Sequence, residues 1–199
     1  AAQMSHTLGM KDSNPDIDYN IKGTANLLRC CVESNPAVKI VYAGSRGQYG
    51  HVEQLPVKED HPMYPLGSHE ISKQAAEGYL FSYHRSHGLR TISTRLSNIY
   101  GPRAQMQSPE FGVINWFVRL ALDKKPIPIM GNGLIKRDCL YVDDCVGALL
   151  LLGSMDKTIG NIYNVGNSTP SNFKTIAEAI SKETDAEIVY TEFSDDRKR

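Results

Sequence analysis

Hydrophobic positions recur along the chain with two different spacings, which predict two kinds of secondary structure. Spacings of three and four residues are typical of amphipathic helices and occur in residues 13–34, 69–87, 109–125, 142–155 and 172–185. Short apolar or extended runs are typical of strands and occur in residues 38–45, 89–100, 126–133, 135–142, 161–167 and 186–193. Because strands and helices alternate, the pattern favours an α/β fold with a mainly parallel sheet.

Turn-forming residues mark where several of these helices begin and end. Ser13 or Asn14 is expected to cap the first helix, whose first turn then holds Pro15. Gly88 is expected to end the helix that begins near residue 69, because glycine adopts the left-handed conformation common at helix ends. Ser171 is expected to cap the last helix.

Composition and charge exclude several classes of protein. The 199 residues are 41% hydrophobic and 22% charged, which is ordinary for a globular protein. Lys+Arg and Asp+Glu balance at 22 each, so no net charge draws the chain toward nucleic acid or an anionic membrane. No apolar run approaches the roughly 18–20 residues of a membrane-spanning helix. The sequence therefore predicts neither a nucleic-acid-binding protein nor a membrane protein.

The cysteines favour a reducing compartment and no metal site. Cys30 and Cys31 are adjacent, while Cys139 and Cys145 lie far downstream. Adjacent cysteines are a poor disulfide framework, and none of the spacings matches a set of metal ligands. We therefore expect a cytoplasmic protein with reduced thiols and no bound metal.

Candidate chemistry gathers where the predicted strands end, because ligands of open α/β sheets bind beyond the carboxyl ends of the strands. Ser45 ends the strand over 38–45. His69 and Lys73 lie four residues apart in the next helix, so both side chains share one helix face. Taken singly, these are an ordinary turn serine and an ordinary solvated pair. Together they are predicted to converge on one small molecule.

A series of ordered motifs resembles a known family. The motifs are "AAQ" at the start, then "DYNIKGTANLL", "AGSRGQYG", "SHEISK", "RLSNIYGP", "PIPIMGNGLIKRDCLYVDDCVGA" and "IYNVGN". In this order and at these intervals they resemble the extended short-chain dehydrogenase/reductases, specifically the NAD-dependent nucleotide-sugar epimerases and dehydratases. Each motif alone is weak, whereas the ordered set covers nearly the whole chain.

The resemblance implies a fold, a cofactor and an assembly. It implies a partial doubly wound, Rossmann-type parallel sheet with a small C-terminal substrate-binding lobe. Residues 1–103 would belong to the dinucleotide-binding domain and residues 104–199 mainly to the nucleotide-sugar-binding lobe, with 138–166 returning to the Rossmann sheet. The cofactor would be NAD, with NADP left open. The helices near 13–34 and 69–87 would pair in a homodimer.

The resemblance also implies roles for individual residues. The catalytic set would be Ser45, His69 and Lys73. The cofactor would contact Ala1, Ala2, Gln3, Lys73 and Ser97. The nucleotide sugar would contact Asn98, Asn115, Met130 and Arg137, although Met130 could equally be a core residue and Arg137 could pair with Asp138. Asn20 would be the structural asparagine of the family.

Two departures from the family pattern affect these expectations. The chain has no G-x-x-G-x-x-G motif, so we expect it to be the C-terminal portion of a longer enzyme, without the pyrophosphate half of the cofactor site. His69 stands where the family has the tyrosine of Y-x-x-x-K. An imidazole has an ordinary pKa near 6.5 and can serve as a base at neutral pH. Two hypotheses remain: His69 forms an acid–base set with Ser45 and Lys73, or the chain is a relative that binds nucleotide sugars without turnover.

The residues after Ser45 bear on the type of reaction. The family's 4,6-dehydratases have Asp-Glu at this point, whereas this chain has Arg46 and Gly47. Elimination is therefore less favoured than epimerisation, in which a sugar carbon is transiently oxidised and the hydride is returned. A 4,6-dehydratase, a 4-keto-reductase and a non-catalytic relative stay as alternatives. Glu59 and Glu70 are expected on solvated faces. The sugar, the nucleotide and the reacting carbon remain open.

Overall fold

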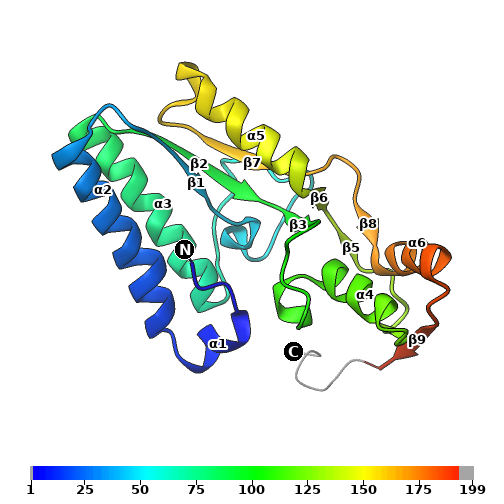
Figure 1. The fold of residues 1–199 in the computed structure, drawn as a ribbon. Coiled ribbons are helices and arrows are strands. Elements are labelled where there is room, and N and C mark those ends of the chain that lie inside the picture. Colours follow the sequence, from blue (N-terminus) through cyan, green and yellow to red (C-terminus); the bar gives the residue numbers. More distant parts are fainter. Residues whose placement is uncertain (1, 193–199) are drawn as a thin grey trace. The chain divides into compact units, whose positions relative to one another are not determined.

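The computed structural model describes residues 2–192, which form two compact units (Figure 1). Unit 1 holds residues 2–97 and 143–165, and unit 2 holds residues 98–142 and 166–192. Each unit is built around its own apolar cluster. Within residues 2–192, no helix combines the length and the apolar character that crossing a membrane requires.

A three-stranded parallel sheet forms the centre of unit 1. Its strands are β1 (Lys39–Ala43), β2 (Arg90–Leu96) and β7 (Ile162–Val165), in the order β1-β2-β7. The register pairs Lys39 with Arg90 and Ser93 with Ile162. β2 has a neighbour on each side and is buried from Thr91 to Arg95. The predicted α/β fold with parallel strands is therefore confirmed.

The helical segments of unit 1 either precede β1 or lie between β1 and β7 in the sequence. The α-helices are α1 (His6–Lys11), α2 (Gly23–Ser34), α3 (Ser68–His87) and α5 (Val142–Ser154). A π-helical turn, Asp16–Lys22, runs directly into α2, and two 3-10 helices cover Arg46–Tyr49 and Asp156–Thr158. Figure 1 shows α2 and α3 side by side in this unit.

Helices pack on both faces of the sheet, as a doubly wound fold requires. Successive side chains of a strand point to opposite faces. Ile40 and Tyr42 of β1 pack against the cluster that α2 and α3 form around Leu28. Val41, between them, instead adjoins Gly153 of α5, where a Cβ would lie 3.3 Å from the Cγ2 atom of Val41.

Two predicted helix ends of unit 1 are found in the structure. Gly88 ends α3 in the left-handed conformation, with φ 69°, as predicted. The helical segment that contains the π-helical turn begins at Asn14, and Ser13 lies directly before it. The carbonyl oxygen of Ser13 accepts from the N–H of Ile17 over 3.1 Å, so Ser13 occupies the predicted cap position. The backbone N–H of Asn14 donates to the carboxylate of Asp12.

Unit 2 consists of short paired strands and two α-helices. β3 (Asn98–Tyr100) pairs with β6 (Cys139–Tyr141), and β4 (Ile127–Met130) pairs with β9 (Ile188–Thr191), both in parallel. β5 (Lys136–Arg137) pairs antiparallel with β8 (Ser171–Asn172). The helices are α4 (Val113–Leu122) and α6 (Phe173–Thr184), and a 3-10 helix covers Pro109–Phe111.

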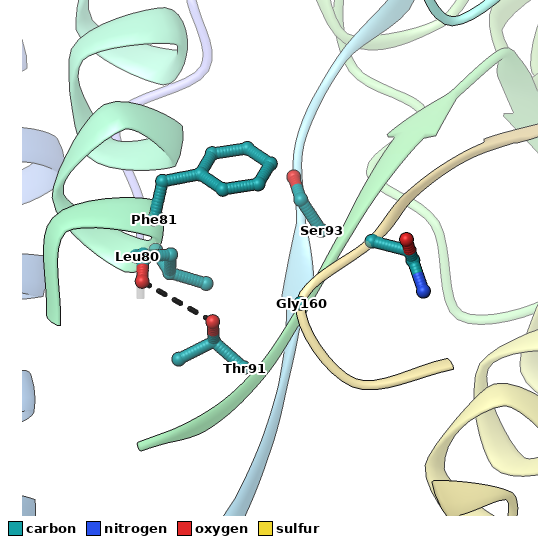
Figure 2. Close-up of a pocket in the computed structure, with 6 residues that line it drawn as sticks. Leu80, Phe81, Thr91, Ser93 and Gly160 are labelled. Carbon is teal, nitrogen blue, oxygen red and sulfur yellow. Dashed lines mark hydrogen bonds between the residues drawn. The ribbon is translucent and has the colours of Figure 1, made fainter. Parts of the chain in front are cut away.

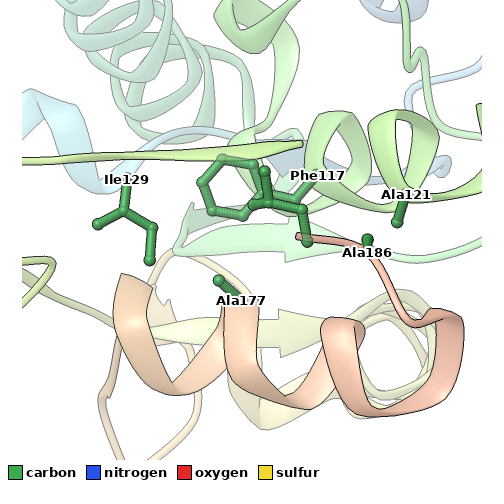
Figure 3. Packing of buried hydrophobic residues seen from close by; sticks show 6 residues of the cluster. Phe117, Ala121, Ile129, Ala177 and Ala186 are labelled. Atoms are coloured by element: carbon green, nitrogen blue, oxygen red, sulfur yellow. The ribbon is translucent and has the colours of Figure 1, made fainter. Parts of the chain in front are cut away.

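An apolar cluster holds unit 2 together (Figure 3). Phe117 and Ala121 come from α4, and Ala177 of α6 faces them. Ile127 and Ile129 come from β4 and are almost fully buried, at 0% and 1% exposure. The alternating burial of β4 follows from its packing on one face only.

Two sequence-based expectations for unit 2 are corrected. The single strand predicted over 135–142 is two strands that are interrupted at Asp138. The backbone carbonyl of Asp138 accepts from Asn98, and its carboxylate accepts from the backbone N–H of Asn167. The cap of α6 is Asn172 and not Ser171, because the Asn172 side chain accepts from the N–H of Thr175 over 2.8 Å.

Candidate active site

Ser45 lies just beyond the carboxyl end of β1 and caps the 3-10 helix that follows. Its Oγ accepts from the N–H of Gly47 over 3.1 Å, and its own N–H donates to Oε1 of Gln48 over 2.9 Å. The Ser45 side chain also accepts from the backbone N–H of Gln48, which completes a capping box and holds the serine side chain in one orientation. A hydroxyl that accepts from Gly47 can still donate its own hydrogen to a ligand oxygen.

Lys73 reaches the same strand end from α3. Its Nζ donates to the carbonyl oxygen of Ala43 over 3.0 Å and lies 5.2 Å from the centre of the Tyr42 ring. Burial lowers the pKa of Lys73 from its ordinary value. The structure therefore brings the Lys73 ammonium to the residue that lies two positions before Ser45.

His69 lies in the first turn of α3, one helical turn before Lys73, and is 8% exposed. Its Nδ1 lies 3.1 Å from the carbonyl oxygen of Gln3. A carbonyl oxygen only accepts hydrogen bonds, so the neutral ring carries its hydrogen on Nδ1 and its lone pair on Nε2. In this tautomer Nε2 is the atom that can take a proton.

Asn20 joins the N-terminal segment to the start of α3. Its Oδ1 accepts from the N–H of Gln3 over 3.1 Å. Its Nδ2 lies 2.8 Å from Oγ of Ser72, and the Ser72 hydroxyl donates to the carbonyl oxygen of His69 over 2.7 Å. Asn20 is 3% exposed, so these bonds are shielded from water. The network sets the position of the His69 backbone.

The described residues among those predicted to contact a dinucleotide lie in unit 1. Ala1 lies outside the described residues, and Ala2 is exposed. The side chain of Gln3 donates to the carbonyl oxygen of Ser5 over 2.9 Å. Ser97 follows β2, and its buried Oγ has no hydrogen-bond partner within residues 2–192. An unsatisfied buried hydroxyl costs about 1–3 kcal/mol, so a polar group from a ligand at this strand end would be stabilised.

The residues predicted to contact a nucleotide sugar all lie in unit 2. Asn98 donates from its side chain to the carbonyl oxygen of Asp138 over 2.8 Å. Asn115 is 6% exposed, and its Oδ1 accepts from the N–H of Gly101 over 3.1 Å. The Arg137 guanidinium lies 5.6 Å from the Phe173 ring centre, and Met130 is 36% exposed at the end of β4. Met130 is therefore no core residue.

Two buried carboxylates near the candidate site were missed by the sequence analysis. Glu70 is 8% exposed, so its predicted place on a solvated face is wrong. A Cβ on Gly47 would lie 2.7 Å from Cγ of Glu70, and a Cβ on Gly67 would lie 2.7 Å from its Oε2, so both glycines make room for this side chain. Asp16 is 0% exposed. Neither carboxylate lies on the apolar face of its helix, so hydrophobic spacing does not predict its burial. For Glu70, the sequence feature that relates to burial is the pair of nearby glycines, Gly47 and Gly67.

A recess elsewhere in unit 1 is separate from the predicted catalytic residues (Figure 2). It lies between α3, β2 and the segment before β7, and it is lined by Leu80, Phe81, Thr91, Ser93, Gly160 and Asn161. The hydroxyl of Thr91 donates to the carbonyl oxygen of Leu80 over 3.2 Å, as drawn in Figure 2. None of the predicted catalytic residues lines this recess. For the part of the chain that the structure describes, no cluster of three or more His, Cys, Asp or Glu residues is placed to hold a metal ion.

Comparison with known proteins places this geometry in a family. Residues 1–166 match the model of the NAD dependent epimerase/dehydratase family. The CDP-paratose 2-epimerase of Salmonella typhi is 30% identical over 190 residues, which cover 84% of this chain and 56% of that protein.

Solved structures that resemble this chain include nucleotide-sugar epimerases. The UDP-N-acetylglucosamine 4-epimerase from Methanobrevibacter ruminantium M1, in complex with UDP-N-acetylmuramic acid, is 27% identical with a TM-score of 0.91, over 98% of this chain and 63% of that one. The UDP-glucose 4-epimerase of Thermus thermophilus, in complex with NAD, is 31% identical with a TM-score of 0.84, over 96% of this chain and 63% of that one. The chain thus spans between 56% and 63% of the length of these relatives. With a family match over residues 1–166 and a shared fold, the chain belongs to the NAD-dependent epimerase/dehydratase family.

Proposed function

We propose that this chain carries the acid–base residues and the sugar-nucleotide site of an NAD-dependent epimerase of nucleotide-diphosphate sugars. One observation carries the proposal. The Lys73 ammonium is bonded to Ala43, at the strand end that leads into Ser45, and Lys73 shares a helix face with His69. An ammonium, a hydroxyl and an imidazole are thereby assigned to the carboxyl end of a parallel strand, where α/β proteins bind ligands.

Each of these three residues has its own role in the proposed reaction. Nε2 of His69 takes the proton of a sugar hydroxyl while the hydride leaves the same carbon, and it returns the proton when the hydride comes back. The Ser45 hydroxyl donates to the same sugar oxygen and holds it in place. The Lys73 ammonium stabilises negative charge on that oxygen and binds the ribose of the cofactor. Bound NAD would supply the hydride acceptor and, in its reduced form, the hydride donor.

The residues of unit 1 are compatible with NAD as the cofactor. The buried Ser97 hydroxyl, without a partner in the described chain, lies at the end of the central strand β2. A hydroxyl of the cofactor would satisfy it. Gln3 and Lys73 complete the set that we assign to the dinucleotide. The NAD complex of the Thermus thermophilus relative supports NAD as the cofactor.

We assign the nucleotide-diphosphate part of the substrate to unit 2. The Arg137 guanidinium presents donors in a planar fork that matches phosphate oxygens. Asn98 and Asn115 add amide groups on β3 and α4, and Met130 adds an apolar surface at the end of β4. The names of the relatives, which include UDP- and CDP-sugar epimerases, support this class of substrate.

A 4,6-dehydratase is the second candidate, and one observation favours it. Elimination needs a carboxyl group beside the oxidation site, and the chain has Arg46 and Gly47 where the family's 4,6-dehydratases have Asp-Glu. Glu70 is nevertheless buried against Gly47. Ser45 Oγ lies 3.3 Å from the position that a Cβ of Gly47 would occupy, and Oε1 of Glu70 lies 3.2 Å from the same position. A carboxyl group is thus present beside the serine.

We also propose that the protein is a cytoplasmic homodimer. Exposed apolar side chains on α2 and α3 support a dimer interface, because Leu27, Ile71 and Tyr79 are 55%, 51% and 43% exposed. Large apolar side chains that gather on neighbouring helices are typical of interfaces. The free thiols of Cys30 and Cys31 support a reducing compartment.

Product analysis with the intact protein tests the proposed reaction. UDP-glucose, UDP-N-acetylglucosamine and a CDP-hexose are each incubated with the protein and NAD, and the products are identified by NMR. We expect an epimer of one substrate, and a loss of about 100-fold or more in kcat for His69→Gln and Ser45→Ala. The matched control is His87→Gln, an exposed histidine at the other end of α3 that should keep full activity.

Each other outcome has a definite meaning. A 4-keto-6-deoxy product would replace the epimerase by the dehydratase. Tight sugar-nucleotide binding without any product would show a non-catalytic relative. Full activity in His69→Gln would reject the imidazole as the base.

A further inference from the structure

A buried carboxylate lies beside the candidate base. Asp16 begins the π-helical turn and is 0% exposed. Its Oδ1 lies 3.9 Å from Nδ1 of His69 and accepts from Nδ2 of Asn20 over 3.2 Å. Its Oδ2 is buried and has no hydrogen-bond partner in residues 2–192. The chain has thus placed an ionisable group where water cannot solvate it.

The packing around Asp16 depends on a glycine that leaves space for the carboxylate. A Cβ on Gly9 of α1 would lie 2.4 Å from Oδ2 of Asp16, so a side chain at position 9 would displace the carboxylate. A buried carboxylate is costly unless a cation or several donors compensate it. His69 is a group that can become cationic within 4 Å of Asp16. A protonated imidazole would therefore stabilise the Asp16 carboxylate.

The surroundings of His69 place its hydrogen on the side of Asp16. From the N-terminal segment, Gln3 presents an uncharged carbonyl oxygen 3.1 Å from Nδ1. From the π-helical turn, Asp16 presents a carboxylate. Along α3 itself, Lys73 lies one turn away and Glu70 is the next residue. Two acceptors therefore face Nδ1, which keeps its hydrogen and leaves the lone pair on Nε2.

We propose that Asp16 is a positioning residue that fixes the tautomer of His69 and stabilises its imidazolium form. When Nε2 takes the proton of the sugar hydroxyl, the O–H bond breaks and an N–H bond forms, and bound NAD would accept the hydride with its electron pair. The new positive charge on the ring then lies beside the Asp16 carboxylate. Asp16 would do for the imidazole what a buried aspartate does for the histidine of a catalytic triad. The catalytic part of this inference rests on the proposed function, whereas the tautomer does not.

Long-range ¹H–¹⁵N spectra of the intact protein, labelled in histidine, test the pair directly. His69→Gln assigns the ring signals by difference. We expect the neutral His69 ring to carry its hydrogen on Nδ1. In Asp16→Asn, the ring should titrate at lower pH than in the wild type, because a nearby carboxylate favours the charged form of an imidazole. The matched control is Asp18→Asn, an exposed carboxylate on the same turn that pairs with Lys22 and should change nothing.

Kinetics give a second readout that a structural role would not change. The acid limb of the pH–rate profile should move to lower pH in Asp16→Asn, and kcat should fall at least about tenfold while KM changes little. If Asp16→Asn fails to fold, the wild-type spectrum decides: hydrogen on Nε2 of the neutral ring overturns the proposal.

The remaining outcomes separate this inference from the proposed function. Turnover with an unchanged His69 titration in Asp16→Asn overturns the pair and keeps the epimerase. An Asp16-dependent titration without turnover of any nucleotide sugar supports the pair and removes the epimerase.

Discussion

The ammonium group of Lys73 donates a hydrogen bond to the carbonyl oxygen of Ala43 over 3.0 Å. This bond joins α3 to the last residue of β1, across 30 positions of sequence. Helix and strand are thereby linked at the end of the sheet where Ser45 begins the next turn. The Lys73 side chain is partly buried in this position, so its charge affects how the stability of the fold depends on pH.

Lys73→Met should change how stability depends on pH. Burial lowers the pKa of Lys73 below 10.5 in the folded protein. Between the lowered pKa and 10.5 the unfolded chain binds more protons than the folded one, so the free energy of unfolding of the wild type should rise with pH in this window. Lys73→Met should lack that rise. Urea unfolding between about pH 8 and 10.5 measures it, with the exposed Lys58→Met as the control. Identical pH dependence in wild type and Lys73→Met would contradict the prediction.

The buried ion pair of Glu77 and Arg95 should contribute strongly to stability. The Arg95 NH2 group lies 2.7 Å from Oε1 of Glu77, and both side chains are at most 3% exposed. Glu77→Gln leaves the guanidinium charge buried without its partner, which costs about 3–5 kcal/mol. Thermal and urea unfolding measure the loss.

An exposed ion pair serves as the control for this experiment. Asp156 contacts Lys39 and Arg90, which lower the pKa of the Asp156 carboxyl. Because this carboxylate is solvated, Asp156→Asn should leave the unfolding midpoint at neutral pH nearly unchanged. A midpoint shift in Asp156→Asn as large as that in Glu77→Gln would show that burial is not the deciding factor.

Gly50→Ala should destabilise the turn that follows Ser45. Gly50 has φ 64°, and a Cβ there would lie 1.7 Å from the carbonyl oxygen of Tyr64. An alanine would meet both backbone strain and a collision with backbone, so we expect a loss of more than about 1 kcal/mol. Gly78→Ala is the matched control, because Gly78 lies inside α3 with nothing within 4 Å of its Cβ position. Alanine there should stabilise by about 0.5–1 kcal/mol. Differential scanning calorimetry of both variants measures the change in stability, which we expect to be a loss in Gly50→Ala and a gain in Gly78→Ala.

Ser97→Ala should have opposite effects on the protein without cofactor and on cofactor binding. The buried Ser97 hydroxyl lacks a partner in residues 2–192, so its removal should leave stability unchanged or higher. If NAD satisfies this hydroxyl, its affinity should fall about fivefold, the equivalent of about 1 kcal/mol. Calorimetric titration with NAD and thermal unfolding give the two values.

Ser93, on the strand that Ser97 follows, provides the comparison. The hydroxyl of Ser93 donates to Oε2 of Glu77 over 2.7 Å, so Ser93→Ala should lower stability and leave NAD affinity unchanged. Equal loss of stability in the two variants would show that Ser97 is satisfied in the folded protein.

The regular elements were predictable from the sequence because they depend on local spacing. The apolar run before Ser45 and the helical spacing that ends at Gly88 correspond to β1 and α3. His69 and Lys73 were expected on one helix face for the same reason. The sequence analysis missed a strand boundary that depends on tertiary hydrogen bonds. Asp138 divides β5 from β6 and is bonded to Asn98 and Asn167. No local pattern contains such partners.

The sequence by itself determined the parallel α/β architecture and the family, because hydrophobic periodicity and the order of motifs are properties of the chain. Only the tertiary structure placed Asp16 beside His69 and Glu70 beside Ser45. Each of these carboxylates is buried because glycines make room for it, Gly9 for Asp16 and Gly47 and Gly67 for Glu70. Such an environment arises when separate segments pack together, and therefore carries no signal in the spacing of residues along the chain.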